Sequence, residues 1–396
     1  MALPLSGVKV LDLSRVLAGP NCAMFLADMG ADVTKIESTD GGDEARAWVP
    51  RKGEESAAFL ALNRNKRGMT LNLKTEEGAE VLRRMVRDAD VLVENFRAGM
   101  MNRLGLGYEE LSAVNPRLVY CSISAFGETG PLKDEVGYEA ILQAYGGVMS
   151  VTGEPDGEPV RCGLSFIDLT TGIVSAYAVM GALLQRERTG EGQKVETSLL
   201  ETVVSLLNYH AQAYLLDGTV PGRLGSGHPS MVPYRNFRCR DGRFIFIAAS
   251  NDRLWNNLCE ALGMNHLLED PRFEDGLKRG ENREELEEII AAKVAEHDLA
   301  LIRKVLRDGG VPAAPVNTVD RVMNEPQLRH RQMIQTVTHS TLGDVQILGQ
   351  PMKFSAIEPR EATASPTYGE HTDEILRELG YREEEVAALR NKKVVR

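Results

Sequence analysis

Asp168 is a lone carboxylate in an otherwise uncharged stretch of the chain. It follows Gly163-Leu-Ser-Phe-Ile167, and no charged residue occurs from Leu169 to Gln185. An acid in such surroundings is costly unless it caps a helix, pairs with a cation or takes part in chemistry. Two interpretations therefore stay open. Asp168 caps the N-terminus of a helix, or its carboxylate reacts.

The residues that follow Asp168 predict the element that positions it. Ala, Val, Met and Leu recur at helical spacing between Leu169 and Gln185, so Asp168 should lie at or just before the N-terminus of a buried helix. Backbone N–H groups and the helix dipole would hold the carboxylate ionised there. After a polar turn at Thr189–Gln193, a second long helix is predicted over 195–216.

The first half of the sequence alternates strand and helix patterns. A strand at Val8–Leu13, a helix from Pro20 to Met29 and a strand at Val33–Glu37 form a βαβ unit. The pattern repeats with a helix and two further strands, at 75–87, 90–94 and 118–123. We therefore predict a doubly wound α/β domain with a parallel sheet. Its first turn lacks the GxGxxG fingerprint, so we do not expect NAD.

The second half predicts a smaller α+β domain and a return to strands. A segment rich in Gly and Pro at 217–230 marks a linker, and Asp241-Gly242 supplies the turn of a hairpin over 237–248. Helical patterns follow at 252–262, 283–296 and 300–307. The tail has strand patterns near 337 and 345–348, and a helix over 372–380.

The composition limits the classes of partner and cofactor. A net charge of -11 disfavours nucleic acid and anionic membranes as partners, although a local basic pocket could still bind phosphates. The five scattered cysteines lack CxxC spacing, which suits reduced thiols. The N-terminus has no signal-peptide pattern, and the longest uncharged stretch is too short to span a membrane. The seven histidines lack ligand spacing, so no metal site is predicted. We expect a cytoplasmic protein with no tightly bound cofactor.

Several segments resemble the class III CoA-transferases, the group that contains formyl-CoA and carnitine CoA-transferases. They occur in the family's order, and they include Leu11-Asp-Leu-Ser-Arg-Val-Leu-Ala-Gly-Pro20, Gly30-Ala-Asp-Val-Thr-Lys-Ile-Glu37, Val93-Glu-Asn-Phe96, Gly137-Tyr-Glu139 and His228-Pro-Ser-Met-Val-Pro-Tyr234. The resemblance implies a Rossmann-like large domain built from both chain ends, 1–200 with 325–396. It also implies a linker region at 201–230, a small α+β domain at 231–324, and a homodimer of two interlocked rings.

The resemblance assigns Asp168 the role of nucleophile, with Tyr138 as a second catalytic residue. In the family reaction the aspartate attacks the donor thioester and forms an acyl-aspartyl anhydride, which the CoA thiolate converts to an aspartyl-CoA thioester. An acceptor carboxylate then attacks this thioester, and CoA finally moves to the acceptor. Acyl-CoA and a small carboxylic acid are thus the expected substrates.

The resemblance also implies where CoA binds. Arg15, Val16 and Leu17 match the family loop that lines the thioester end of CoA. The residues that match its adenine, ribose and phosphate side are Leu71, Lys74, Asn95, Phe96 and Arg103. For Lys74 and Arg103, a solvated helix face is the alternative. Ser38 departs from formyl-CoA transferases, which have an arginine there that meets the CoA phosphates.

The α-methylacyl-CoA racemases share this fold and are the main alternative. They move an α-proton with a His/Asp pair on one side and a Glu on the other. Tyr138 and Asn251 stand at the positions of that His and Glu, and neither exchanges protons easily. The sequence therefore favours a transferase. A non-catalytic CoA-binding relative stays open if Asp168 only caps a helix.

Within this family, the sequence most resembles transferases that use succinyl-CoA-type donors and small dicarboxylic acceptors. A distal carboxylate needs a cation, which Arg15 or Arg46 could supply, although each could instead hold a CoA phosphate or a surface acid. Gly225, Gly227 and His228 lie in a glycine-rich segment. In relatives a glycine loop covers the intermediate and excludes water, whereas an ordinary linker is the other interpretation.

Overall fold

The computed structural model describes residues 2–357 and 361–396, which form two compact units. The first unit contains Met1–Gly147, Cys162–Ala211 and Pro326–Arg396, and the second contains Val148–Arg161 and Gln212–Glu325. Both ends of the sequence thus contribute to the first unit. The segment Val148–Arg161 belongs to the second unit, whereas the division drawn from the sequence assigned it to the large domain.

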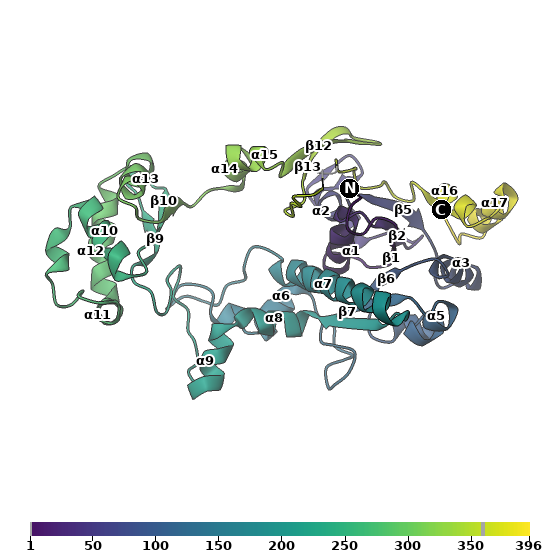
Figure 1. The fold of residues 1–396 in the computed structure, drawn as a ribbon, viewed down its shortest axis with the longest axis horizontal. Coiled ribbons are helices and arrows are strands. Elements are labelled where there is room, and N and C mark those ends of the chain that lie inside the picture. Colours follow the sequence, from purple (N-terminus) through teal and green to yellow (C-terminus); the bar gives the residue numbers. More distant parts are fainter. Residues whose placement is uncertain (1, 358–360) are drawn as a thin grey trace. The chain divides into compact units, whose positions relative to one another are not determined.

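A parallel sheet forms the centre of the first unit (Figure 1). Its strands lie in the order β5 (Lys66–Thr70), β2 (Asp32–Glu37), β1 (Lys9–Asp12), β6 (Val91–Glu94), β7 (Val119–Ser124) and β8 (Lys194–Ser198). Every neighbouring pair in this order is parallel. The predicted α/β class with a parallel sheet is confirmed.

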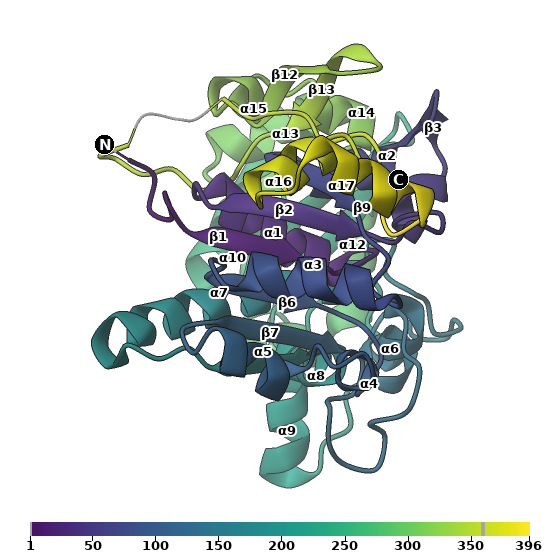
Figure 2. The same cartoon turned by 90° about the vertical axis from the view of Figure 1, so that its right-hand side faces the viewer.

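Helices cover both faces of this sheet. Figure 2 shows one face covered by α3 (Glu76–Val86), α5 (Tyr108–Val114), α16 (Thr372–Glu378) and α17 (Glu383–Asn391). The other face carries α1 (Ala18–Asp28) and α7 (Phe166–Thr189), which pack against each other. Strands buried on both faces read as continuous apolar runs, and Val91-Leu-Val93 is an example.

The last part of the chain returns to the edge strand β5. The backbone N–H of His371 donates to the Gly68 carbonyl at 2.8 Å, and that of Asn72 donates to the Val394 carbonyl at 2.8 Å. Figure 1 shows α16 beside β5. The smaller elements of the first unit are η1 (Glu44–Ala47), β3 (Arg51–Lys52), β4 (Glu55–Ser56), α2 (Ala57–Leu62), α4 (Met100–Arg103), α6 (Glu139–Tyr145), α8 (Leu199–Leu207), α15 (Pro326–His330), β12 (Ile334–His339) and β13 (Gly343–Leu348).

The second unit packs helices on an antiparallel sheet. The sheet order is β11 (Ala313–Pro315), β10 (Phe244–Ala248) and β9 (Tyr234–Arg238), and Gly242 at φ 79° makes the predicted hairpin turn. The other elements are η2 (Val148–Ser150), α10 (Asp252–Leu262), η3 (Asn265–Leu268), α11 (Gly276–Glu281), α12 (Arg283–Ala295), α13 (Leu299–Asp308) and α14 (Val319–Met323). Helix α9 (Tyr209–Asp217) begins in the first unit and ends in the second. Trp255 and Phe273 lie in its apolar core.

The helix predicted over 195–216 is wrong. The chain there forms strand β8, helix α8 and helix α9 in succession. Ser198 ends the strand and caps α8, because its side chain accepts a hydrogen bond from the Glu201 backbone N–H. Asn208 then takes a positive φ of 45°, which no regular helix accommodates. Apolar spacing alone did not reveal these two interruptions.

Helix α7 carries Asp168 near its first residue. Among the described residues it is the helix that is long and apolar enough to cross a membrane, judged by length and composition alone. Core helices pass the same test, and α7 packs along α1 and strands β7 and β8. The helix has 24 residues and extends beyond the uncharged segment 169–185. It can include the charged Arg186 near its C-terminal end because this side chain is buried and paired with Asp90.

Candidate active site

A cavity of about 460 Å³ lies at the carboxyl ends of β1, β6 and β7, entirely within the first unit. Ligands of open α/β sheets bind at this edge of the sheet. The loops after β1 and β6, the start of α6 and the first turn of α7 form its wall. It brings together eight of the predicted site residues: Arg15, Val16, Leu17, Asn95, Phe96, Arg103, Tyr138 and Asp168.

Glu139 positions the first turn of α7. Its Oε2 accepts a hydrogen bond from the Asp168 backbone N–H at 2.8 Å, and its Oε1 accepts one from Ile167 N–H at 3.3 Å. Gln143 donates to the same Oε1 at 2.8 Å and orients the carboxylate. Glu139, the first residue of α6, therefore accepts hydrogen bonds from backbone N–H groups at the N-terminus of α7 that have no partner within that helix. The sequence analysis did not select it.

The Asp168 side chain lies on the cavity wall and does not cap the helix. Among the described residues, no hydrogen bond reaches its carboxyl group, and the N-cap position of α7 is Ser165. Asp168 is 8% exposed, and burial together with the nearby Glu139 charge raises the pKa of its carboxyl to about 7. Our expectation that the helix N-terminus holds Asp168 ionised is thus wrong, because Glu139 takes those N–H groups.

The loop 15–17 has a constrained backbone. Val16 adopts φ 69°, a conformation that costs a β-branched residue roughly 1–3 kcal/mol. Its N–H donates to Asp43 Oδ1 at 3.0 Å. On the other side, the side-chain amide of Asn95 bonds both the N–H and the carbonyl of Arg15, each at 2.8 Å. The surroundings therefore determine this loop, as is typical of functional sites.

The loop after β6 is held by a buried acid. Glu94 Oε2 accepts from the Phe96 backbone N–H at 2.8 Å, and its Oε1 accepts from the Ser122 hydroxyl at 2.7 Å. Burial raises the pKa of Glu94 to about 7. The Phe96 ring in turn lies 5.2 Å from the Arg15 guanidinium carbon, measured to the ring centroid.

Four cations line the cavity and suit an anionic ligand. The sequence analysis identified Arg15 and Arg103, and it missed Arg97 and Lys133. Among the described residues, the ion pair of Arg15 is a long contact of 3.5 Å to the exposed Glu44. The signal for Arg97 was available, because it directly follows Asn95 and Phe96 at the end of a strand. Guanidinium groups bind phosphate and carboxylate well.

Leu71 and Lys74 lie outside the cavity wall. Leu71 is 2% exposed and belongs to the core between the sheet and α3. Lys74 is exposed, and its backbone N–H donates to Asn72 Oδ1 at 3.1 Å. Their assignment to CoA stays a prediction from the family resemblance.

Arg46 is engaged inside the protein. Its Nε and Nη2 donate to the two carboxylate oxygens of Glu37 at 2.7 and 2.8 Å, and Nη1 lies 3.4 Å from Glu55. The guanidinium also stacks on Phe59, with 3.5 Å to the ring centroid. It does not line the cavity around Asp168. These contacts favour a structural role over the substrate contact expected from the sequence.

The glycine-rich segment belongs to the second unit. Gly225 has φ 60°, its N–H donates to the Gly153 carbonyl at 2.8 Å, and a Cβ there would lie 2.6 Å from a Glu154 carboxylate oxygen. A side chain at Gly227 would lie 3.0 Å from the Leu224 carbonyl oxygen. His228 Nδ1 accepts from the Ser230 backbone N–H at 3.1 Å.

The two positions that decide the racemase alternative differ in their surroundings. Tyr138 lines the cavity and is 61% exposed. Asn251 caps helix α10, because its Oδ1 accepts from the Leu254 backbone N–H at 3.0 Å. A capping amide is no acid or base. The observed role of Asn251 therefore offers no second base for racemisation.

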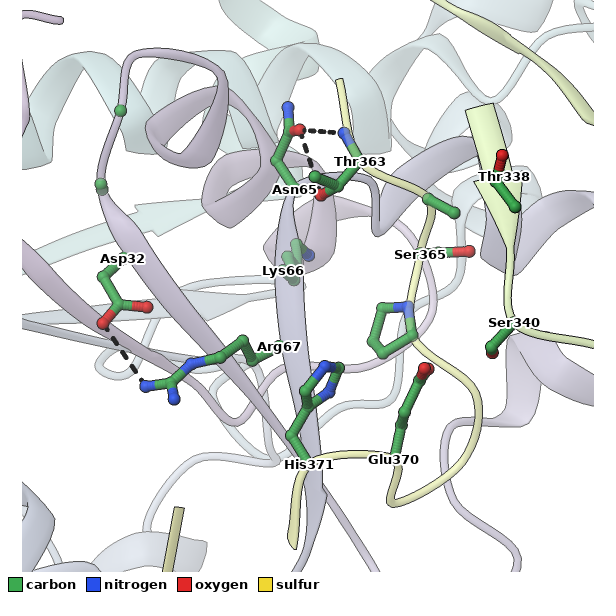
Figure 3. A pocket seen from close by; sticks show the side chains of 14 residues that line it. Asp32, Asn65, Lys66, Arg67, Thr338, Ser340, Thr363, Ser365, Glu370 and His371 are labelled. Atoms are coloured by element: carbon green, nitrogen blue, oxygen red, sulfur yellow. Dashed lines mark hydrogen bonds and ion pairs between the residues drawn. The ribbon is translucent and has the colours of Figure 1, made fainter. Parts of the chain in front are cut away.

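A second cavity, of about 600 Å³, lies between β5 and the C-terminal return (Figure 3). Several of its polar groups already have partners in or beside the cavity. Arg67 contacts Asp32 at 3.4 Å and Glu378 at 2.8 Å, and Asn65 accepts from Thr363 N–H at 2.8 Å. None of the predicted site residues lines it. The smaller cavity around Asp168 is thus the candidate active site.

Known proteins resemble this chain along almost its whole length. The model of CoA-transferase family III matches residues 5–372. A succinate–glutarate CoA-transferase of Agrobacterium fabrum is 39% identical over 383 residues, which cover 95% of this chain and 96% of that protein. A succinyl-CoA:mesaconate CoA-transferase of Haloarcula hispanica is 40% identical over 386 residues, with coverages of 95% and 96%.

A solved structure gives the same result. The crystal structure of a CAIB/BAIF family protein from Brucella suis superposes with a TM-score of 0.87 at 39% identity, and the match covers 96% of this chain and all of that one. The matched family model and the two enzymes named above agree in class. The chain belongs to CoA-transferase family III.

Proposed function

We propose that this CoA-transferase moves CoA from a succinyl-CoA-like thioester to a small dicarboxylic acid through covalent intermediates on Asp168. The observation that carries the proposal is the Asp168 carboxyl itself. It is buried, free of hydrogen bonds among the described residues, and part of the same cavity wall as Arg15 and Arg103. The relatives named for succinyl-CoA, glutarate and mesaconate support the substrate class.

The proposed reaction exchanges one bond at each step. A carboxylate oxygen of Asp168 attacks the thioester carbonyl, the carbon–sulfur bond breaks, and CoA leaves as a thiolate. The thiolate attacks the aspartyl carbonyl of the anhydride, which releases the donor acid and leaves an aspartyl-CoA thioester. The acceptor carboxylate attacks that thioester, the carbon–sulfur bond breaks, and a second anhydride forms between Asp168 and the acceptor. The released thiolate attacks the acceptor carbonyl of this anhydride, which breaks its bond to the Asp168 oxygen and forms the acceptor's CoA thioester. Asp168 ends as a carboxylate.

The raised pKa of Asp168 suits this role. With a pKa of about 7, the carboxylate is more basic than an ordinary aspartate and is still largely ionised at slightly alkaline pH. The exposed phenol of Tyr138 lies on the same wall, where it could donate a hydrogen bond to the oxyanion of each tetrahedral intermediate.

The cations of the cavity divide between two tasks in this proposal. Arg97 and Arg103 contact the CoA phosphates, because their side chains reach the cavity from the segment that follows β6. Arg15 meets the distal carboxylate of the acid. It stands beside Val16 and Leu17, whose family counterparts line the thioester end, and its contact to Glu44 is long.

We also propose a cytoplasmic homodimer. Helix α7 exposes large apolar side chains, including Ile173 at 49%, Tyr177 at 76% and Leu184 at 60%. Monomeric proteins rarely leave such side chains in contiguous exposed patches, and the family resemblance implies interlocked subunits. Light scattering on the purified protein tests the stoichiometry, and a monomer at micromolar concentration would contradict it.

The proposed function is tested by measuring the mass of the intact protein after incubation with succinyl-CoA. Hydroxylamine or borohydride trapping and peptide mapping should place the adduct on Asp168. Asp168→Asn should form no adduct, lose turnover and still bind CoA, whereas Asp88→Asn, at an exposed acid away from the cavity, should behave as wild type. Absence of an adduct, together with α-proton exchange in deuterated buffer, would favour a racemase instead.

A panel of acceptors then tests the substrate class. Succinate, glutarate and mesaconate should accept CoA with higher kcat/KM than monocarboxylates of similar length. Equal rates for mono- and dicarboxylates would contradict a dicarboxylate-specific site and leave the transferase assignment intact.

A further inference from the structure

A buried ion pair lies behind the loop 15–17. Asp43 Oδ1 accepts from the backbone N–H groups of Val16 at 3.0 Å and Ala45 at 2.9 Å. Its Oδ2 pairs with the Lys35 ammonium at 3.0 Å, and both side chains are fully buried. Neither Asp43 nor Lys35 lines the cavity. The pair therefore contacts the back of a loop whose residues line the cavity.

Lys35 and Asp43 hold the loop at two separate points. The Lys35 ammonium donates to the carbonyl of Ser14, and Asp43 accepts from Val16. Asp43 is itself fixed, because its backbone N–H donates to Glu37 Oε2 at 3.0 Å. Since Lys35 and Glu37 belong to β2, the loop after β1 is tied to the neighbouring strand.

The surroundings of Lys35 favour its charged form. Burial alone would lower the pKa of Lys35, but Asp12, Asp43 and Glu37 around it raise the pKa above its usual value. A second ammonium, Lys66, pairs with Asp12 at 2.8 Å. Each of these two buried cations therefore has a buried carboxylate as its direct partner.

The strained backbone of Val16 depends on this contact. Without the Asp43 acceptor, a buried N–H would lose its partner and Val16 would lose its reason to keep φ 69°. Relaxation to a negative φ would turn the peptide groups on both sides of Val16. Arg15 and Leu17 would then move, and both line the cavity.

We propose that Asp43 and Lys35 are positioning residues for CoA transfer, which act by holding Val16 in its left-handed conformation. This inference rests on the proposed function, because the loop matters to catalysis only if the cavity binds the thioester. The ion pair does not line the cavity, and its effect passes through the backbone of the loop.

A double-mutant cycle with Asp43→Asn and Val16→Gly tests the proposal. Asparagine has one acceptor oxygen and one NH2 group, so it can accept from the Val16 N–H or from the Lys35 ammonium but not from both, and one of the two contacts is lost. Glycine adopts φ 69° without steric cost, so the loop of the Val16→Gly variant needs Asp43 less. We expect Asp43→Asn to lower kcat by at least about tenfold when Val16 is present, with little change in the donor KM. In the Val16→Gly background the loss should be less than about threefold. Equal losses in both backgrounds would overturn the proposal.

Asp28→Asn is the matched control. Asp28 is equally buried and pairs with Arg64 in the same unit, but it makes no contact with the loop 15–17. All rates are corrected for the folded fraction, measured by urea unfolding. A loss of kcat in Asp28→Asn as large as that in Asp43→Asn would show a general effect of buried charges and overturn the specific one.

Trypsin supplies a readout that needs no activity. Arg15 is exposed at 43% of its side chain, and cleavage after it requires the loop to open. Asp43→Asn should accelerate cleavage of the Arg15–Val16 bond at least about fivefold, and Asp28→Asn should leave that bond unchanged. If Asp43→Asn fails to fold, Lys35→Met is tested in the same way and should also accelerate it. An unchanged cleavage rate would overturn the proposal that Asp43 and Lys35 hold the loop.

The two proposals can fail separately. If the wild-type protein fails to transfer CoA from any donor, the proposed function is disproved. The trypsin rates then still test whether Asp43 and Lys35 hold the loop. If the wild-type protein transfers CoA but the effects of the two substitutions on kcat simply multiply, only the proposal that Asp43 and Lys35 hold the loop is disproved.

Discussion

Glu139 and Asp168 lie 29 residues apart in the sequence and meet at the N-terminus of α7, where Glu139 Oε2 accepts the Asp168 backbone N–H at 2.8 Å. A single acid at a helix end would have to accept the backbone N–H groups and also present its carboxyl to the cavity, whereas here each acid has one of these tasks. Glu139 satisfies the N–H groups, and the Asp168 carboxyl is left for the cavity. Their proximity also disfavours two negative charges and contributes to the raised pKa of Asp168.

The pH dependence of turnover should report Asp168. With its pKa raised to about 7, kcat/KM should rise through pH 7 as the nucleophile ionises. Glu139→Gln keeps an oxygen that accepts the Asp168 N–H but removes the charge, so the rise should shift to lower pH. Glu135→Gln, another acid of the cavity wall, is the control. An unshifted profile in Glu139→Gln would contradict the electrostatic coupling.

Stability should fall as pH rises toward neutrality. The pKa values of Asp168 and Glu94 are both raised to about 7 in the folded state. Between about pH 4.5 and 7 the native state therefore binds more protons than the unfolded one, and each group lowers the free energy of unfolding by up to about 1.4 kcal/mol per pH unit.

Urea unfolding at pH 5, 6 and 7 measures this slope. Glu94→Gln and Asp168→Asn should each flatten it, and the exposed Glu109→Gln should not. A slope that is identical in all four proteins would show that neither buried acid is protonated in the native state.

Arg46 should matter for stability and not for acceptor binding. Arg46→Met leaves Glu37 and Glu55 as buried charges without their partner, which should lower the free energy of unfolding by about 3–5 kcal/mol. Arg51→Met, which breaks an exposed pair with Glu54, should cost less than about 1 kcal/mol. A selective rise in the acceptor KM, with stability intact, would restore Arg46 as the carboxylate anchor.

Arg15 should distinguish dicarboxylic from monocarboxylic acceptors. If it binds the distal carboxylate, Arg15→Met should raise the KM of glutarate by roughly 10–100-fold, the loss of one charged hydrogen bond. The KM of a monocarboxylate of the same length should change little. Arg103→Met should instead weaken CoA itself, because Arg103 is assigned to its phosphates. A uniform loss for both acids in Arg15→Met would contradict the assignment.

Much of the first unit could be predicted from local patterns. The strands around Val10, Val33 and Val91 are short apolar runs between turn signals, and in the second unit helix Asp252–Leu262 was bounded correctly because Asn251 caps it and Gly263 ends it. Such signals lie within a few residues of the element they define. The position of Asp168 in the first turn of a long apolar helix followed in the same way, although one side of that helix is exposed and not buried.

Long-range contacts could not be predicted from one sequence. Glu139 looks like an ordinary helix-start acid, and only the fold brings it to Ile167. Arg46 was a candidate partner for a substrate carboxylate, but the sequence does not show that Glu37 and Glu55 converge on it. Asn95 and Arg15 likewise meet because their strands are neighbours in the sheet. These errors and omissions all concern polar partners that lie in different elements, whether nine residues apart, as Arg46 and Glu37 are, or 80, as Arg15 and Asn95 are.

The return of the last helices to β5 has a consequence for synthesis on the ribosome. The core around Leu71 is completed by Leu376, Val386 and Val394, which are translated long after Asp168. The second unit is contiguous apart from one short segment, and it can emerge and pack first. The nascent chain thus holds an unfinished first unit while the second unit is already folded, which predicts slow maturation and a need for protection from aggregation until translation ends.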